Sequence, residues 1–260
     1  MGRVIPFSEF QRYISEQRRR SDFFTGAILD TNILVAMSYE VKKEFERVRE
    51  LLDIATEEGF RFFATVTTKA EFIDFNRRLI MTESLIDLVD AHSKAKITKG
   101  AKAAIDSATG TLRANVIRAA DPVFTDTQLK NIKRSFSAGQ HSGHAGWLTI
   151  CKETLPDRLR EVEEILFDRG VEYISPHDNK NEIFNRTLEW DEAIRIVAST
   201  SISMSDAMIL NALQASKCQF IVSMDFDIGY AALSSKDTKD VVMPDDQARE
   251  FRDYHFEHLV

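Results

Sequence analysis

The sequence predicts an α/β fold with a mainly parallel, doubly wound sheet and a helical insertion. Short apolar runs typical of buried strands alternate with longer segments whose apolar residues recur at helical spacing. This alternation predicts parallel strands joined by helices that cover both faces of the sheet. The composition agrees, because 260 residues with 43% hydrophobic and 29% charged residues can bury a substantial core.

Five strands are expected, because each is a short apolar run bounded by polar or turn-forming residues. They are residues 26–29, 61–66, 171–174, 219–223 and 240–243. The first of these strands is followed by Asp30, Thr31 and Asn32, which are turn-forming residues and therefore predict the exit of the strand.

Helices are expected where apolar residues recur every three to four positions. They cover about residues 8–20, 41–58, 68–80, 159–169, 187–198 and 205–215. Gly59 and Gly170 are natural stops at helix C-termini, and Thr68 with Glu71 has the spacing of a capping box at a helix N-terminus.

The domain organisation follows from a break in this alternation. We expect an N-terminal helical extension over residues 1–25 and an α/β domain over residues 26–260, interrupted by a basic helical insertion at about residues 87–155. From Ala91 to Lys152 the chain carries ten Lys and Arg against three acidic residues, a local charge of +7, whereas the whole chain carries −7. The rest of the chain therefore carries a net charge of −14.

This basic segment has two interpretations. It is either a surface that contacts RNA phosphates or an ordinary solvated helical face. Candidates for phosphate contacts are Lys94, Lys96, Lys99, Lys102, Lys130, Lys133 and Arg134. Phe124, Phe136 and Trp147 interleave with these charges and fit either base stacking or a helical core.

Other features exclude several classes of protein. Cys151 and Cys218 match no metal-binding or redox spacing. No apolar run approaches the roughly 18 residues of a membrane span, and neither a signal-peptide pattern nor a glycine-rich nucleotide-binding loop is present. We therefore expect a cytoplasmic protein that does not contact membranes.

Four acidic residues fall near the rim where the predicted parallel strands end. Asp30 leaves the first strand, Glu71 opens the helix after the second, Asp206 opens a late helix, and Asp225 leaves the strand 219–223. Taken singly, each acid also fits a helix cap or a turn. Together they favour a Mg²⁺ or Mn²⁺ site, because carboxylates that meet repel each other unless a cation lies between them.

The same residues carry a family resemblance. Four strings resemble, in order, the motif series of PIN-domain nucleases; they are AILDTNIL at 27–34, TTKAEF at 67–72, SMSDAMIL at 203–210 and IVSMDFDIG at 221–229. Similarity to this family implies a doubly wound α/β domain that uses Mg²⁺ or Mn²⁺ to hydrolyse phosphodiester bonds in RNA, usually single-stranded. The resemblance covers about residues 27–87 and 157–243, and the segment between them is longer than compact members need.

The resemblance also implies roles for individual residues. By motif position Asp30, Glu71, Asp206 and Asp225 match the family's catalytic and metal-binding acids, and the implied mechanism is in-line attack by a metal-activated water. Three further residues match or adjoin accessory positions of the family. Asn32 matches a polar residue, Ser223 takes the place of a frequent Thr, and Asp227 is an additional acid. A homodimer or an inhibitory protein partner is compatible with the same resemblance.

Two other functions remain open. A non-catalytic module of the same fold would bind RNA or a protein without cutting, since a fold alone does not establish an activity. A phosphatase of the haloacid dehalogenase type is suggested by the string MDFDIG. In that class, however, the Asp-x-Asp motif begins the fold, whereas here only 33 residues follow Asp227.

Overall fold

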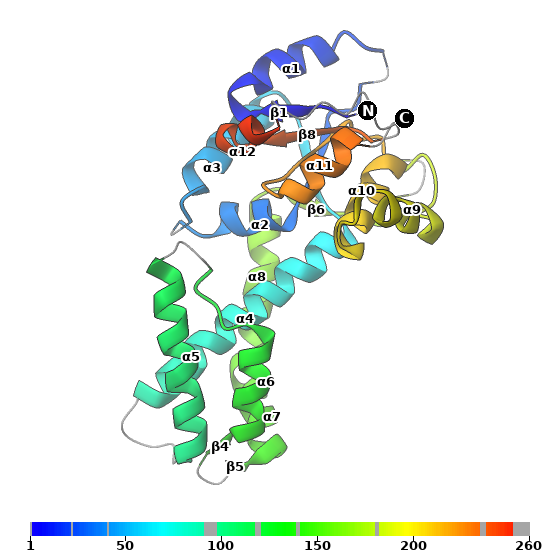
Figure 1. The fold of residues 1–260 in the computed structure, drawn as a ribbon. Coiled ribbons are helices and arrows are strands. Elements are labelled where there is room, and N and C mark those ends of the chain that lie inside the picture. The colour runs from blue at the N-terminus through cyan, green and yellow to red at the C-terminus, as the bar shows by residue number, and fades with distance from the viewer. Residues whose placement is uncertain are drawn as a thin grey trace. The chain divides into compact units, whose positions relative to one another are not determined.

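The computed structural model describes residues 2–21, 23–40, 42–90, 98–117, 121–138, 141–179, 182–234 and 238–251. The chain forms two compact units. Unit 1 comprises Met1–Phe72 and Leu166–Val260 and holds a six-stranded sheet, and unit 2 comprises Ile73–Ile165 and is mainly helical (Figure 1). The basic insertion expected at 87–155 lies within unit 2.

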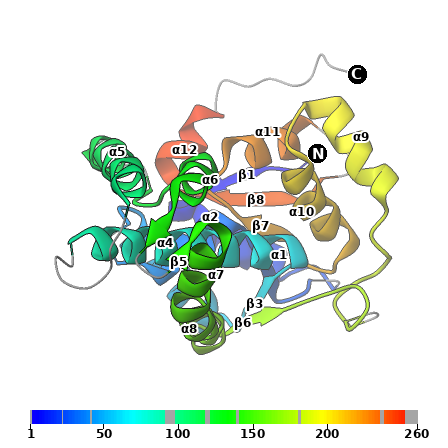
Figure 2. The same cartoon turned by 90° about the horizontal axis from the view of Figure 1, so that it is seen from below.

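The sheet of unit 1 is entirely parallel, with strand order β1-β8-β7-β2-β3-β6. Figure 2 labels β1, β8, β7, β3 and β6 in this order. Its strands are β1 (Val4–Pro6), β2 (Gly26–Leu29), β3 (Arg61–Ala64), β6 (Val171–Tyr173), β7 (Phe220–Val222) and β8 (Asp240–Met243). The predicted α/β class with a parallel sheet is confirmed. All five predicted strands are present, and β1 is an addition.

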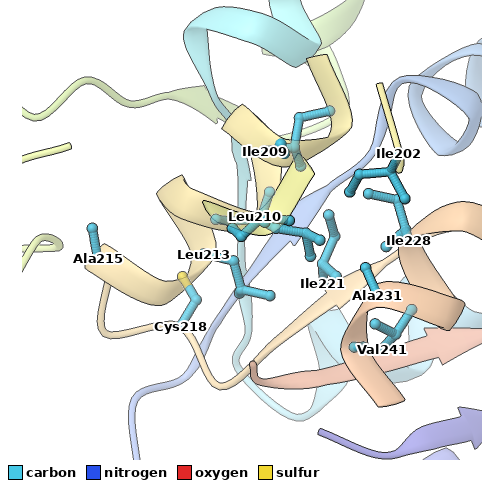
Figure 3. Packing of buried hydrophobic residues seen from close by; sticks show 14 of the residues in the cluster. Ile202, Ile209, Leu210, Leu213, Ala215, Cys218, Ile221, Ile228, Ala231 and Val241 are labelled. Atoms are coloured by element: carbon cyan, nitrogen blue, oxygen red, sulfur yellow. The ribbon is translucent and has the colours of Figure 1, made fainter. Parts of the chain in front are cut away.

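Helices cover both faces of this sheet, as successive residues of β7 demonstrate. Phe220 packs edge-on against Phe10 and Tyr13, with ring centroids 5.6 and 5.7 Å apart. Ile221, whose side chain points to the opposite face, belongs to the core that Leu210 and neighbouring helices complete (Figure 3). The helices wholly within unit 1 are α1 (Phe10–Gln17), α2 (Thr31–Ser38), α3 (Phe45–Glu57), α9 (Trp190–Thr200), α10 (Met204–Ala215), α11 (Phe226–Ser234) and α12 (Asp245–Glu250).

Helix α2 corrects the expectation of a simple turn after the first strand. Asp30 is the N-cap of this helix, and Thr31 and Asn32 are its first residues. The segment Ile33–Met37 is buried throughout. It therefore lacks the polar positions that would produce a helical period in the sequence. Helices α11 and α12 were likewise not predicted.

Unit 2 has its own apolar core. It contains α5 (Lys99–Ile117), α6 (Asp126–Ser135), α7 (Gly143–Thr154), parts of α4 (Val66–Asp90) and α8 (Pro156–Asp168), and the antiparallel pair β4 (Ser137–Ala138) and β5 (His141–Ser142). Phe124, Phe136 and Trp147 are buried in this core, with the last two rings edge-on at 5.8 Å. Their interpretation as base-stacking residues is therefore wrong.

The net charge of unit 2 is less basic than its central segment. Residues 73–165 carry 14 Lys and Arg against 12 Asp and Glu, a net charge of +2, because acidic residues of α4 and α8 flank the basic segment. Unit 1 carries the remaining −9. In the part of the chain that the structure describes, no helix has the length and apolar character needed to cross a membrane.

Candidate functional site

Asp30 is held at the carboxyl end of β2 by three hydrogen bonds. Its Oδ1 accepts a hydrogen bond from the backbone N–H of Thr31 at 2.6 Å. Its Oδ2 accepts from the Ser223 hydroxyl at 2.5 Å and from the Asn32 side-chain amide at 2.8 Å. Asp30 is only 4% exposed, so these neighbours replace the water that normally surrounds a carboxylate.

The environment of Asp30 favours its protonated form. The pKa of Asp30 is raised to about 7, mainly by burial and to a smaller extent by the charges of Asp225 and Asp206, while the hydrogen bonds from Ser223 and Thr31 act to lower it. A buried carboxylate with a raised pKa and acidic neighbours indicates a position where positive charge would be stabilising.

Ser223 and Asn32 connect Asp30 to Asp225. The Ser223 hydroxyl donates to Asp30 and accepts a hydrogen bond from the backbone N–H of Asp225 at 2.9 Å. The Asn32 side-chain oxygen accepts from the backbone N–H of Met224 at 3.0 Å. Asn32 and Ser223, two of the three predicted accessory residues, therefore hold the loop after β7 against the start of α2.

Asp225 and Asp227 lie at the N-terminal end of α11. The Oδ1 of Asp225 accepts a hydrogen bond from the backbone N–H of Asp227 at 2.7 Å, as an N-cap residue does. One carboxylate oxygen of Asp225 therefore caps the helix, as the turn or cap interpretation of this residue predicts. Both acids remain close enough to Asp206 to raise its pKa.

Glu71 does not take part in the capping box expected with Thr68. Instead, Thr68 exchanges hydrogen bonds with Thr65, donating its backbone N–H to Oγ1 of Thr65 at 3.2 Å and accepting the N–H of Thr65 at 2.8 Å. The Glu71 side chain instead contacts two other helices. One carboxylate oxygen accepts from the Thr31 hydroxyl at 2.5 Å, and the other accepts from the Ser205 hydroxyl. Glu71 therefore links α4 to α2 and α10.

Asp206 lies in the first turn of α10, which begins one residue earlier than predicted. Ser203 is the N-cap, and its hydroxyl accepts from the backbone N–H of Asp206 at 3.1 Å and donates to its carboxylate at 2.6 Å. Half-burial raises the pKa of Asp206, the Ser203 hydrogen bond lowers it, and Asp225, Glu71 and Asp227 raise it. Asp206 is therefore a first-turn acid held by the N-cap residue Ser203, as the helix-cap alternative for this residue predicts.

The structure brings all four predicted acids, and Asp227, into one electrostatic neighbourhood at the carboxyl ends of β2, β3 and β7. None of the five forms an ion pair with a Lys or Arg that the structure describes. Across the described residues, however, no three Asp, Glu, His or Cys side chains are arranged to hold one metal ion. The acids are thus neighbours whose oxygens do not point to a common centre.

The chemistry of these donors nevertheless suits a hard divalent cation. All of them are carboxylate oxygens, which Mg²⁺ and Mn²⁺ prefer, and Mg²⁺ commonly uses only one or two protein carboxylates together with water and substrate phosphate. The raised pKa values of Asp30 and Asp206 are the observation that supports this fit, because a cation would relieve the repulsion that contributes to them.

Thr31 and Ser205 are the site residues that sequence reasoning missed. Each donates its hydroxyl to Glu71, although the sequence shows them only as small polar neighbours of Asp30 and Asp206. A hydroxyl next to each acid, in DTN and MSD, is the signal that could have indicated them.

The predicted RNA contacts lie in unit 2. Lys99, Lys102, Lys130 and Arg134 are exposed on α5 and α6, and Lys133 is half-buried. None of these five forms an ion pair with a described carboxylate, so their charges are available to an anion. Lys94 and Lys96 lie outside the described residues.

Comparison of the chain with models of known protein families, with curated proteins and with solved structures finds no significant match, so a function has to be argued from the site itself.

Proposed function

We propose that the protein hydrolyses phosphodiester bonds in single-stranded RNA with the help of Mg²⁺ or Mn²⁺, as a PIN-type endoribonuclease. The observation that carries the proposal is the group of carboxylates at the carboxyl ends of parallel strands. Burial and, to a smaller extent, their mutual repulsion raise the pKa of Asp30 and Asp206, and no described basic side chain pairs with them. Proteins with a parallel α/β sheet bind their ligands at the carboxyl ends of the strands.

Asp30, Asp206 and Asp225 are the residues that would hold the cation, with Glu71 and Asp227 as further acids nearby. A bound Mg²⁺ or Mn²⁺ lowers the pKa of its water and offsets the charge of a phosphate. The protein itself holds the acidic side chains in fixed positions. Ser223 and Asn32 fix Asp30 relative to the loop that carries Asp225, and Thr31 and Ser205 fix Glu71.

The helices add a second electrostatic contribution. Asp30 caps α2, Ser203 caps α10 next to Asp206, and Asp225 accepts from the first turn of α11. Asp30, Asp206 and Asp225 therefore lie at the N-termini of three helices. Partial positive charge at helix N-termini favours carboxylates there and also attracts the phosphate groups of a substrate.

Cleavage of single-stranded RNA in Mn²⁺ and in chelator tests the proposal. We expect Mn²⁺-dependent cleavage by the wild type and its loss in Asp206→Asn, which keeps a side-chain oxygen for Ser203 and removes one charge. Asp246→Asn is the matched control, because Asp246 faces Arg47 at 3.4 Å rather than the carboxylate group. This control should cleave normally.

Thermal melts provide a readout that does not depend on activity. Mn²⁺ at a hundred times its dissociation constant should stabilise the wild type by about 2.7 kcal/mol, and Asp206→Asn by clearly less. Equal metal-induced shifts together with normal cleavage in the variant would contradict the proposed site. RNA binding by the wild type without cleavage in Mn²⁺ would favour the non-catalytic module.

A further inference from the structure

Three exposed apolar residues lie at the beginnings of helices α4, α10 and α11, which also carry Glu71, Asp206 and Asp227. Val66, Met204 and Phe226 are each the first residue of a helix, namely α4, α10 and α11. They are 51%, 39% and 37% exposed. Helices α10 and α11 begin at the sheet edge where Asp206 and Asp225 lie, and the Cα–Cβ bonds of a helix tilt toward its N-terminus. We refer to these three residues as the apolar rim.

Phe226 is the most firmly held member of the rim. Its ring stacks on Phe251 with centroids 4.7 Å apart and an interplanar angle of 18°, and lies 6.4 Å from the ring of Tyr230 at the same angle. Gly229 makes room for this arrangement, because a Cβ there would lie 2.7 Å from Phe251. A ring that is already fixed loses little entropy when it binds a flat ligand.

The apolar rim and the acidic residues together suit a ligand in which flat apolar groups lie next to charged groups. Phe226 lies in the chain between Asp225 and Asp227, and Met204 lies between Ser203 and Ser205, whose hydroxyls contact Asp206 and Glu71. Apolar groups thus adjoin the charged centre within one helical turn. Single-stranded RNA repeats the same pairing in every nucleotide, with a flat base next to an anionic phosphate.

We propose that the apolar rim binds the nucleobases next to the phosphate at the carboxylates, with Phe226 as the stacking platform and Met204 and Val66 as apolar contacts. This inference rests on the proposed function, since it takes the RNA strand to lie at the carboxylates. Because every base has a flat face, stacking of this kind selects single strands without selecting a base sequence.

The experiment compares intact RNA with RNA that lacks bases. KM in Mn²⁺ measures the apparent affinity for a single-stranded oligonucleotide while the cation offsets the phosphate charge, and fluorescence anisotropy in chelator gives the affinity that remains without the metal. Phe226→Ala should weaken binding roughly 5- to 150-fold. Phe226→Leu, which keeps apolar volume and protects the fold, should weaken it by a smaller factor. With abasic nucleotides around the cleavage position, wild type and both variants should bind alike.

Phe167→Ala is the matched control. Phe167 is 81% exposed and precedes β6, so it lies at the amino end of the strands, away from the carboxylates. Its removal should leave the affinity unchanged. Unaltered affinity of Phe226→Ala for intact RNA, or an equal loss on abasic RNA, would overturn the inference. Absence of Mn²⁺-dependent cleavage by the wild type would instead contradict the proposed function.

Discussion

Asp30 makes the stability of the metal-free protein depend on pH. Its pKa is about 7 in the folded chain, mainly because of burial, against an ordinary value of 3.8. The folded state therefore binds this proton more tightly than the unfolded state. The resulting stabilisation is complete below pH about 4 and is lost as the pH rises through about 7. We expect the free energy of unfolding to fall over this range by up to about 1.4 kcal/mol per pH unit from this residue.

Denaturant titrations of wild type and Asp30→Asn in chelator measure this effect. Asn keeps a side-chain oxygen for the N–H of Thr31 but has no proton to release. The difference in stability between the two proteins should therefore change with pH in favour of the variant as the pH rises. Parallel pH profiles would show that Asp30 is not the responsible group.

Glu71 should contribute to stability through its hydrogen bonds. It accepts from Thr31 on α2 and from Ser205 on α10. Glu71→Ala removes both bonds and should lower the free energy of unfolding by about 1–3 kcal/mol. Glu71→Gln should cost less, because both hydroxyls can also accept from an amide. Denaturant titration of the two variants in chelator checks this order, and equal losses would contradict it.

The residues around Glu71 also mark a limit of reading the sequence. Thr68 and Glu71 have the correct spacing for a capping box, but spacing cannot distinguish that pair from Thr65 with Thr68, which forms in the structure. The partners of Glu71 lie 40 positions before it and 134 positions after it. Only the folded chain brings them together, so a local pattern could not reveal them.

Among the elements, the cap of α6 offers a direct test of unit 2. Thr125 and Gln128 form a complete capping box, in which the Thr125 hydroxyl accepts from the N–H of Gln128 and the Gln128 side chain accepts from the N–H of Thr125. Thr125→Ala should destabilise the protein by about 0.5–2 kcal/mol. Thr127→Ala, at an exposed position within the same helix, should be neutral or slightly stabilising.

Circular dichroism melts of the two threonine variants separate the cap from helix propensity. A loss in Thr125→Ala that Thr127→Ala does not share would identify the cap as the cause. Equal behaviour of both variants would mean that α6 depends on packing of its apolar face, where Leu129 and Ile132 are buried, rather than on its N-terminus.

The elements that the sequence predicts best are those with one unambiguous pattern. The strand 26–29 and the strand 240–243 have the predicted bounds, because a buried parallel strand is a short continuous apolar run. The same pattern does not predict helix α2, because the apolar run of this helix is also continuous and shows no helical period. Strand β1 was missed because three residues that end in Pro6 carry too little pattern, although proline is tolerated at a sheet edge.

For the whole molecule, the distribution of charge predicts salt-dependent RNA binding through unit 2. Replacing Lys130, Lys133 and Arg134 with Gln should weaken binding and reduce the slope of log affinity against log salt by roughly 0.7 for each phosphate that the variant no longer neutralises. Metal-induced stabilisation should not change, because the carboxylates belong to unit 1.

The matched control for this prediction replaces Arg12, Arg19 and Arg49 of unit 1, all exposed, with Gln. It makes the same change in net charge. If both triple variants lose the same affinity and slope, the effect comes from overall charge, and the basic residues of α6 are an ordinary solvated face.

The strand order has a consequence for the route by which the chain folds. Unit 2 is continuous in sequence, so its helices can assemble as soon as residues 73–165 are available. Unit 1 is discontinuous, and β1 pairs with β8, whose residues lie about 237 positions later. Contacts of such separation carry a large loop-closure entropy and form late. During synthesis on the ribosome, a finished helical unit would therefore precede a sheet that cannot close until its last strand has emerged.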